Sequence, residues 1–292
     1  MEIKKFLNHS NLSDSEKTIN NYLEKIGNAF LNKKATALVG TGFSLNAKKI
    51  NKTGKNIPMW QDIGNLLMEE LSIDKGNNSF VDPIRLSSQY VAYHNENELN
   101  NFLIKNIEDD NFIPDDVHNE FVSLDWNDIF TTNYDTLLER ATKNIDKKYT
   151  VVTDDKSLPS SPKPRIIKLH GSFPDKTPFI MTNEQFRVYP TEHAGFVNTV
   201  QQSFIEDTIV LFGFSGTDPN FQKWTGWIRD NIGEENANNV YLISVDPVSK
   251  AESMLFDDEN IKVIDLSSIL NKDNKIESIK KTFLEIFEYW KN

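Results

Sequence analysis

Cysteine is absent from all 292 residues of the chain. Disulfide bonds, thiolate catalysis and zinc sites built on cysteine are therefore excluded. The absence fits a protein of a reducing compartment, and we expect a cytoplasmic location.

Long apolar runs are also missing, because no stretch of about 18 apolar residues occurs in the sequence. Residues 1–14 contain no apolar segment of the kind that a secretory signal peptide needs. We therefore expect neither secretion nor membrane insertion.

Basic residues are too few to balance the acidic ones. The sequence has 32 Lys and Arg against 43 Asp and Glu, for a net charge of −11. Binding to nucleic acids and to anionic membranes depends on positive charge, so this balance opposes both. We expect no direct nucleic-acid binding and no membrane partner, and a small anionic ligand must be held by local donors.

Short apolar runs alternate with helical patterns along most of the chain, which predicts an α/β fold. The runs lack polar alternation, as do central parallel strands that are buried on both faces. Strands are expected at residues 35–39, 129–130, 149–152, 165–169, 208–212, 240–245 and 261–266, with a short edge strand at 179–181. Helices are expected at residues 13–34, 135–144, 196–204, 219–232 and 276–290.

We interpret residues 1–292 as one domain with a Rossmann-like parallel sheet flanked by helices. Residues 46–125 carry few strand signals and many helical ones. This segment is therefore predicted to be a mostly helical insertion or lid after the first strand.

A glycine-rich turn, Gly40-Thr41-Gly42-Phe43-Ser44, directly follows the first predicted strand. Glycines at such a turn let backbone N–H groups approach a pyrophosphate, and the Ser44 hydroxyl is a further donor. A strand-to-helix turn also uses glycine for its geometry alone, so the motif has two interpretations of similar weight.

Polar residues follow two further predicted strands. Thr131-Thr132-Asn133-Tyr134-Asp135 ends one strand, and His170-Gly171 follows another. The carboxyl ends of parallel strands meet at one edge of a sheet, so these motifs are expected near the glycine-rich turn. Histidine, with a pKa of about 6.5, suits a general base there. Asp135 is also explained as a helix N-cap.

A third turn, Gly213-Phe214-Ser215, ends a later strand and leads into Asp218-Pro219-Asn220, where Asp218 is expected to cap a helix. Backbone groups and the Ser215 hydroxyl can donate to a phosphate or a ribose. Asp246 follows the next strand, where an acidic residue can accept from ribose hydroxyls. A turn formed by Asp-Pro explains Asp246 equally well.

These motifs, in this order, resemble the NAD-binding fold of the SIR2 (sirtuin) family over roughly residues 35–246. The first glycine turn is similar to the family's Gly-Ala-Gly-x-Ser, with Thr41 in place of Ala. The Thr-x-Asn-x-Asp and His-Gly motifs match at residues 131–135 and 170–171. The later Gly-Thr-Ser turn has Phe214 where Thr is usual.

Two departures separate the chain from sirtuin deacylases. The four cysteines that hold their zinc module are missing. Their Ile-Pro-Asp-Phe-Arg segment has its nearest counterpart in Asn56-Ile-Pro-Met-Trp-Gln-Asp62. With Phe214-Ser215 and Asp218-Pro219-Asn220, the chain is more similar to prokaryotic SIR2-like effectors of anti-phage defence. Those proteins hydrolyse NAD and occur with Thoeris, HerA-type ATPase, short Argonaute and other sensor partners.

The resemblance implies NAD⁺ as the substrate, nicotinamide and ADP-ribose as products, and no metal cofactor. It implies that His170 acts as the base, that Asn133 orients water or the ribose, and that Asp135 holds the nicotinamide carboxamide. The residues that it implies for NAD binding are Gly40, Thr41, Gly42, Ser44, Thr132, Gly213, Phe214, Ser215 and Asp246.

Two other functions are compatible with the motifs: a zinc-free deacylase or ADP-ribosyltransferase, and a sensor that binds NAD or ADP-ribose without cleaving it. Asn133 and His170 are both present, and a pure binder needs neither, so hydrolysis is favoured. The 292 residues include no evident sensor domain. We therefore expect control by homo-oligomer formation, by a separate sensor protein, or by another part of a longer protein.

Overall fold

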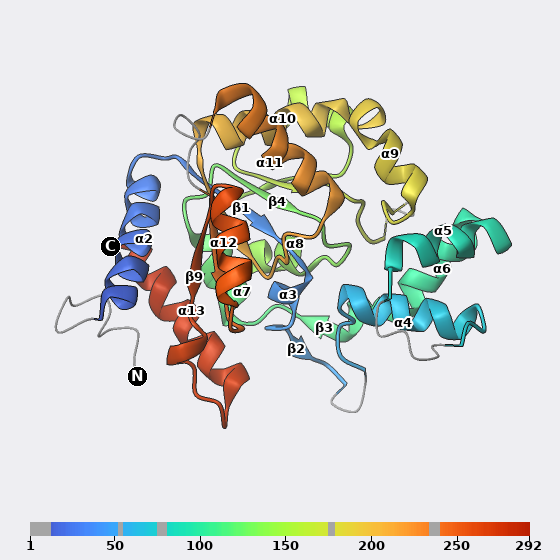
Figure 1. The fold of residues 1–292 in the computed structure, drawn as a ribbon, viewed down its shortest axis with the longest axis horizontal. Coiled ribbons are helices and arrows are strands. Elements are labelled where there is room, and N and C mark those ends of the chain that lie inside the picture. Colours follow the sequence, from blue (N-terminus) through green and yellow to red (C-terminus); the bar gives the residue numbers. More distant parts are fainter. Residues whose placement is uncertain (1–12, 52–54, 75–80, 175–178, 234–239) are drawn as a thin grey trace.

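The computed structural model describes residues 13–51, 55–74, 81–174, 179–233 and 240–292. Within these ranges, seven parallel strands form one sheet in the order β5-β6-β4-β1-β7-β8-β9. Figure 1 labels β1, β4 and β9 of this sheet. Their bounds are β1 Ala35–Val39, β4 Asp128–Thr131, β5 Thr150–Val152, β6 Arg165–Lys168, β7 Thr208–Phe212, β8 Val240–Ser244 and β9 Ile261–Asp265. The predicted α/β fold with a Rossmann-like parallel sheet is confirmed.

The strands are uninterrupted apolar runs because helices cover both faces of the sheet. Every residue of β1 is buried, and so is every residue of β7 after the first. One face packs against α2 (Asp14–Leu31), α7 (Asp116–Ser123), α8 (Leu137–Ala141) and α13 (Lys275–Lys291). The other face packs against α9 (Asn183–Glu192), α10 (Ala194–Glu206), α11 (Pro219–Ile232) and α12 (Lys250–Asp258). The sheet is thus the middle of three layers.

The starts of two helices follow from capping residues in the sequence. Ser13 forms a capping box at the start of α2, in which its N–H donates to the Glu16 carboxylate at 2.7 Å. Asp218 caps α11, because its Oδ1 accepts from Asn220 N and Phe221 N at 2.9 and 3.0 Å. Pro219 occupies the first helical position of α11, where its fixed φ suits the helix.

Three details of the predicted elements are wrong. Residues 179–181 are buried but form no strand, although Ile180 N donates to His170 O at 3.1 Å. The helix expected from residue 135 begins instead at Leu137, because the Asp135 carboxylate accepts from Leu137 N at 3.1 Å and lies outside the helix. Helices α9 and α12 were not predicted, since α9 contains Pro190 and α12 buries Phe256 while its Met254 and Leu255 are exposed.

The segment between β1 and β4 is rich in helices. It contains α3 (Thr41–Ser44), β2 (Lys48–Lys49), α4 (Trp60–Glu70), α5 (Pro83–Tyr93), α6 (Glu96–Ile107) and β3 (Phe112–Ile113). Helices α4, α5 and α6 lie to one side of the sheet in Figure 1, and they share a hydrophobic cluster with Tyr134, Phe173 and Phe179. The antiparallel pair of β2 and β3 was not predicted. That this segment acts as an insertion or lid stays a prediction.

The order of the strands sets the position of the site. β1 pairs with β4 on one side and with β7 on the other. The chain first completes β4, β5 and β6 on one side of β1, and then crosses to β7, β8 and β9. The turns after β1 and β7 therefore lie at a topological switch point, where open α/β sheets leave a ligand crevice.

Candidate functional site

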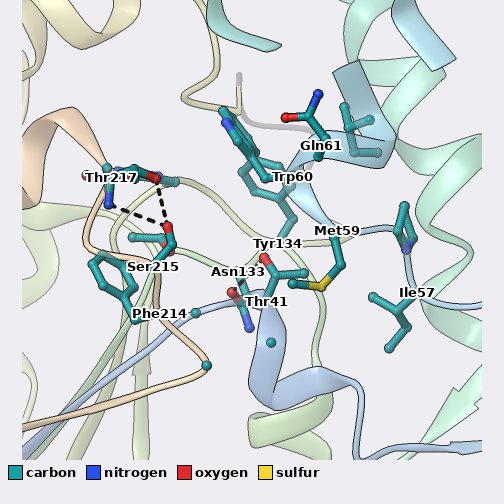
Figure 2. A pocket seen from close by; sticks show the side chains of 18 of the residues that line it. Thr41, Ile57, Met59, Trp60, Gln61, Asn133, Tyr134, Phe214, Ser215 and Thr217 are labelled. Carbon is teal, nitrogen blue, oxygen red and sulfur yellow. Dashed lines mark hydrogen bonds and ion pairs between the residues drawn. The ribbon is translucent and has the colours of Figure 1, made fainter. Parts of the chain in front are cut away.

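A cavity of about 370 Å³ lies at the carboxyl ends of β1, β4, β6 and β7. In Figure 2, Thr41, Asn133 and Tyr134 lie between the loop of residues 214–217 and the segment of residues 57–61 that leads into α4. The predicted site residues that line this cavity are Gly40, Thr41, Gly42, Thr132, Asn133, Asp135, His170, Gly213, Phe214 and Ser215. Four motifs that are far apart in the sequence thus meet at one cavity.

A second cavity of about 680 Å³ adjoins the first, and both are lined by Gly42, Gly213, Phe214 and Ser215. Ser44 and Asp246 line the second cavity and not the first. Asp246 is exposed and forms an ion pair with Lys275 of α13. The structure therefore places Asp246 in a different part of the crevice from Asn133 and His170.

The glycines of the two turns pack directly against one another. Gly42 N donates to Gly213 O at 3.0 Å, and a Cβ atom on Gly40 would lie 2.5 Å from the same oxygen. Gly213 has a φ of +58°, and a Cβ atom there would lie 2.0 Å from Phe43 N. The contact between the turns therefore requires glycine whether or not a ligand binds.

The N–H groups of Gly40, Gly42 and Phe43 all donate to carbonyl oxygens of the protein, at 2.9, 3.0 and 3.1 Å. They are consequently not free to bind a phosphate in this structure. We expected this turn to supply backbone donors to a pyrophosphate. For the N–H group of Thr41, that role stays a prediction.

A buried chain of hydrogen bonds orients the side chain of Asn133. Ser44 Oγ donates to Asp135 Oδ2 at 2.8 Å and accepts from Asn133 Nδ2 at 3.0 Å. A hydroxyl has one proton, so while Asp135 is charged the amide must turn its NH₂ group toward Ser44. The amide oxygen then lies near Thr41, whose hydroxyl is a weak donor at 3.4 Å. Asn133 lines the first cavity, and an accepting amide oxygen there suits a water molecule or a ribose hydroxyl.

The Asp135 carboxylate is held by groups of the protein. Its Oδ1 accepts from Leu137 N and its Oδ2 from Ser44. Burial raises the pKa of Asp135, and the Lys168 ammonium and the Ser44 hydroxyl oppose this rise. Lys168 is itself buried, donates to the Asp135 carbonyl oxygen, and pairs with Glu139 at 2.9 Å. Because both carboxylate oxygens already have donors, the expected contact with a carboxamide stays a prediction.

His170 lines the same cavity and is 3% exposed. Burial lowers the pKa of its imidazole, and the Asp218 carboxylate partly opposes this effect. Asn220 Nδ2 lies 3.3 Å from His170 Nε2, and Asp218 Oδ2 lies 3.7 Å from Nδ1. A lowered pKa keeps the imidazole neutral near pH 7, so it can accept a proton as a general base.

Sequence reasoning missed three apolar residues at this cavity and one residue that contacts His170. Ile57, Met59 and Trp60 form part of an apolar wall opposite residues 214–217 (Figure 2). These residues belong to the segment of residues 56–62, which resembles the Ile-Pro-Asp-Phe-Arg segment of sirtuin deacylases only loosely. The sequence therefore predicted no role for them. Asn220 contacts His170. In the sequence it belongs to the Asp218-Pro219-Asn220 motif, for which no contact with His170 was predicted.

Among the described residues, no group of three or more His, Asp and Glu side chains is arranged to hold a metal ion. In the same parts of the chain, every helix is too short or too polar to cross a bilayer. The site is therefore described by its amide, hydroxyl, carboxylate and imidazole groups.

Comparison with known proteins finds one matching family, the SIR2-like domain, over residues 127–264. NAD(+) hydrolase ThsA of Acinetobacter baumannii is 31% identical over 216 residues, which cover 70% of this chain and 41% of that protein. ThsA of Bacillus cereus is 26% identical over 72% of this chain and 43% of its own length. Defense-associated sirtuin 2 of Bacillus subtilis is 21% identical over 86% of this chain and 25% of its own length. The chain thus spans less than half the length of these relatives.

A solved structure of a mutant Sir2 homologue in complex with ADP-ribose is similar in fold. Its TM-score is 0.51 at 14% identity, and the match covers 91% of this chain and 96% of that chain. At this identity the likeness shows that the two chains share a fold.

Proposed function

We propose that this chain, which contains a SIR2-like domain, hydrolyses NAD⁺ to nicotinamide and ADP-ribose in the cavity beside Asn133 and His170. One observation carries the proposal: an oriented amide and a buried imidazole of lowered pKa line the same cavity at the switch point of a parallel sheet. The relatives named NAD(+) hydrolase support the same chemistry. Because they extend well beyond the shared region, the activity of the whole protein is part of the proposal.

The reaction needs little acid assistance, because the nicotinamide nitrogen of NAD⁺ is already positively charged. It leaves with the electron pair of the glycosidic bond as a neutral base, and the ribose carbon becomes oxocarbenium-like. The oxygen of water then forms the new bond to this carbon. The Asn133 amide oxygen accepts one hydrogen of the water, and His170 takes up the proton that is released. That proton returns to solvent, so NAD⁺ and water give nicotinamide, ADP-ribose and one proton.

The remaining site residues bind NAD⁺ in this proposal. Thr41, Thr132 and Ser215 supply hydroxyl groups beside the turns that contain Gly40, Gly42 and Gly213, and Phe214 adds an apolar surface. Asp246 accepts from a ribose hydroxyl in the second cavity. Ser44 bonds to both Asp135 and Asn133 and supports the Asn133 amide. Asp135, which also lines the first cavity, is the proposed partner of the nicotinamide carboxamide. The proposed chemistry uses no metal ion.

We also propose that this activity serves bacterial anti-phage defence and is kept inactive until it is triggered. The support is the similarity to a protein named defense-associated sirtuin 2. A homo-oligomer or a separate cytoplasmic sensor protein is the proposed partner. Activity should therefore be measured both for the isolated chain and after addition of the product of its genomic neighbour.

The first test is release of nicotinamide and free ADP-ribose from NAD⁺ by the purified chain, without a protein acceptor. His170→Ala and Asn133→Ala are each expected to lower the rate about 10²- to 10⁴-fold, the usual contribution of a general base or its partner. Circular dichroism checks that both variants fold. His94→Ala removes an exposed histidine that lines neither cavity, and this matched control is expected to keep the wild-type rate.

Wild-type rates in both site variants would contradict the proposal. Transfer of ADP-ribose to an acceptor without release of free ADP-ribose would instead indicate a transferase. Binding of NAD⁺ without cleavage, in the presence and absence of the neighbouring gene product, would indicate a sensor.

A further inference from the structure

We propose that Asp218 and Asn220 position His170 by fixing which nitrogen of its imidazole carries the proton. The catalytic consequence of this inference rests on the proposed function, in which His170 is the base. Both side chains come from the first turn of α11, and they face different nitrogens of the ring. Neither residue was expected to act on His170.

Asn220 specifies the state of one nitrogen. Its side chain is buried, and its Nδ2 lies 3.3 Å from His170 Nε2. An amide NH₂ group donates and cannot accept, so Nε2 must be the nitrogen with the free lone pair. The proton of the neutral ring then lies on Nδ1.

Asp218 specifies the same state from the opposite edge of the ring. Its Oδ2 lies 3.7 Å from Nδ1, which is too long for a hydrogen bond but close enough for electrostatic attraction. A carboxylate there favours an N–H over a lone pair on Nδ1. It also stabilises the charge of the imidazolium, which forms at Nε2 when the Asn220 amide turns its oxygen toward that nitrogen.

The helix cap fixes the position of this carboxylate. Asp218 Oδ1 accepts from Asn220 N and Phe221 N, so Oδ2 is the oxygen that remains directed toward His170. The same residue therefore begins α11 and orients the imidazole. Aspartate is a favoured residue at a helix N-cap, and a carboxylate is also a suitable partner for a histidine base.

The neighbouring residues His193, Tyr134 and Tyr189 do not supply the negative charge that Asp218 provides. Burial and the nearby His193 lower the pKa of His170, whereas Asp218 raises it. Burial, with a further contribution from Asp218, raises the pKa of Tyr134 and of Tyr189, which therefore stay neutral. The hydroxyls of these two tyrosines donate to backbone carbonyls at 2.9 and 2.8 Å.

The test uses two substitutions that keep the helix cap, since Asn and Ser cap helices about as well as Asp. In Asp218→Asn, Oδ1 can still cap α11 while an NH₂ group replaces Oδ2 opposite Nδ1. This donor competes with the Asn220 NH₂ group for the one lone pair of the neutral ring. It is expected to reverse the tautomer and place the ring proton on Nε2, with the Asn220 amide turned so that its oxygen accepts from Nε2. Asp218→Ser removes the charge and places no NH₂ group opposite Nδ1, so it is expected to keep the tautomer and lower the pKa of His170.

Nitrogen-15 NMR of histidine in the full chain reads the tautomer and the titration midpoint directly. The His170 signals are assigned by their loss in His170→Gln. Asp82→Asn is the matched control, because Asp82 also caps a helix before a proline, accepts from Ile84 N and Arg85 N at 3.0 and 3.2 Å, and lines neither cavity. This control is expected to leave the His170 signals unchanged.

The rate of NAD⁺ cleavage gives a second readout. Asp218→Asn is expected to lower kcat at least about tenfold with little change in KM, since the base nitrogen is lost while the cavity keeps its shape. In Asp218→Ser the acidic limb of kcat/KM is expected to move to lower pH, because a base of lower pKa is protonated only at lower pH.

Three results would overturn the inference: a wild-type His170 that is protonated on Nε2, a tautomer and midpoint that neither substitution changes, or a higher KM with unchanged kcat. The last result would assign Asp218 to substrate binding. A chain that cleaves no NAD⁺ would refute the proposed function but leave the NMR result intact, so the two failures can be told apart.

Discussion

Ser44 connects Asp135 to Asn133 through a single hydroxyl group. While Asp135 is charged it accepts the hydroxyl proton, and Ser44 must then accept from the amide. A protonated Asp135 can donate instead, which would let the amide turn its oxygen toward Ser44. The orientation of Asn133 is thus set by a charge that does not itself need to touch the ligand.

Replacement of Ser44 tests this arrangement. Ser44→Ala is expected to slow NAD⁺ cleavage about 10- to 100-fold, because the amide loses the group that orients it. It also leaves a buried Asp135 oxygen without its donor, at a cost of about 1–3 kcal/mol in the free energy of unfolding. Nicotinamide release and urea unfolding measure the two effects.

Ser87→Ala provides the control for a buried serine. Ser87 donates to the carbonyl oxygen of Pro83 within α5, at 2.7 Å, and lines neither cavity. This variant is expected to keep the wild-type rate. An unchanged rate in Ser44→Ala would rule out the orienting role.

The chemistry of individual residues could be predicted only in part. Asn133 and His170 were expected at one edge of the sheet because each follows a parallel strand, and both do line the first cavity. Their partners were not predicted, since Ser44 is 89 residues from Asn133 and Asn220 is 50 residues from His170. Local patterns carry no information on which side chains meet across such separations.

The turns after β1 and β7 form a contact that depends on glycine. Gly213→Ala is expected to destabilise the protein by about 2–4 kcal/mol, because alanine disfavours a left-handed φ and its Cβ would force the turns apart. Gly226→Ala is the opposite case, since Gly226 lies within α11 with no atom within 4 Å of a new Cβ. That variant is expected to gain about 0.5–1 kcal/mol.

Urea unfolding of the two glycine variants measures this difference. Equal stability would show that the turns can separate at little cost. The glycines would then need another explanation, such as close approach of a ligand.

Some elements were predictable because their burial leaves a strong pattern. Strands such as β1 and β7 are apolar throughout, since helices cover both faces of the sheet. Residues 179–181 have the same composition for a different reason: Phe179 and Met181 pack into the hydrophobic cluster of α4, α5 and α6. A short apolar run indicates burial, and it cannot distinguish a strand from a buried loop.

The stability of the whole molecule depends on a second buried histidine. His118 of α7 is fully buried, and burial lowers its pKa to about 3. Histidine in the unfolded chain has a pKa of about 6.5, so below that pH the unfolded state binds a proton that the folded state does not. This contribution to stability is fully present above about pH 6.5 and is lost as pH falls toward about 3. His170 acts in the same direction.

His118→Gln is expected to weaken this pH dependence. Glutamine suits the same position in a capping box, where His118 Nδ1 now accepts from Asp115 N at 3.3 Å. Between pH 7 and pH 4 the variant should lose less stability than the wild type, by on the order of 3 kcal/mol. Urea unfolding at several pH values measures the slope, with exposed His94→Gln as control; equal slopes in all three proteins would contradict the role of His118.

The pairing of β1 with β7 also limits how early in synthesis the first cavity can form. Ala35 of β1 pairs with Thr208 of β7. Strand β1 is therefore synthesised long before β7, and the two are separated by more than half of the 292 residues. Asn133 and His170 are synthesised before that partner, whereas the turn at Gly213 and the start of α11 come after it. A nascent chain therefore carries its reactive side chains without the cavity that would use them. The first turnover of the proposed reaction must wait until Gly213 and the start of α11 have been synthesised.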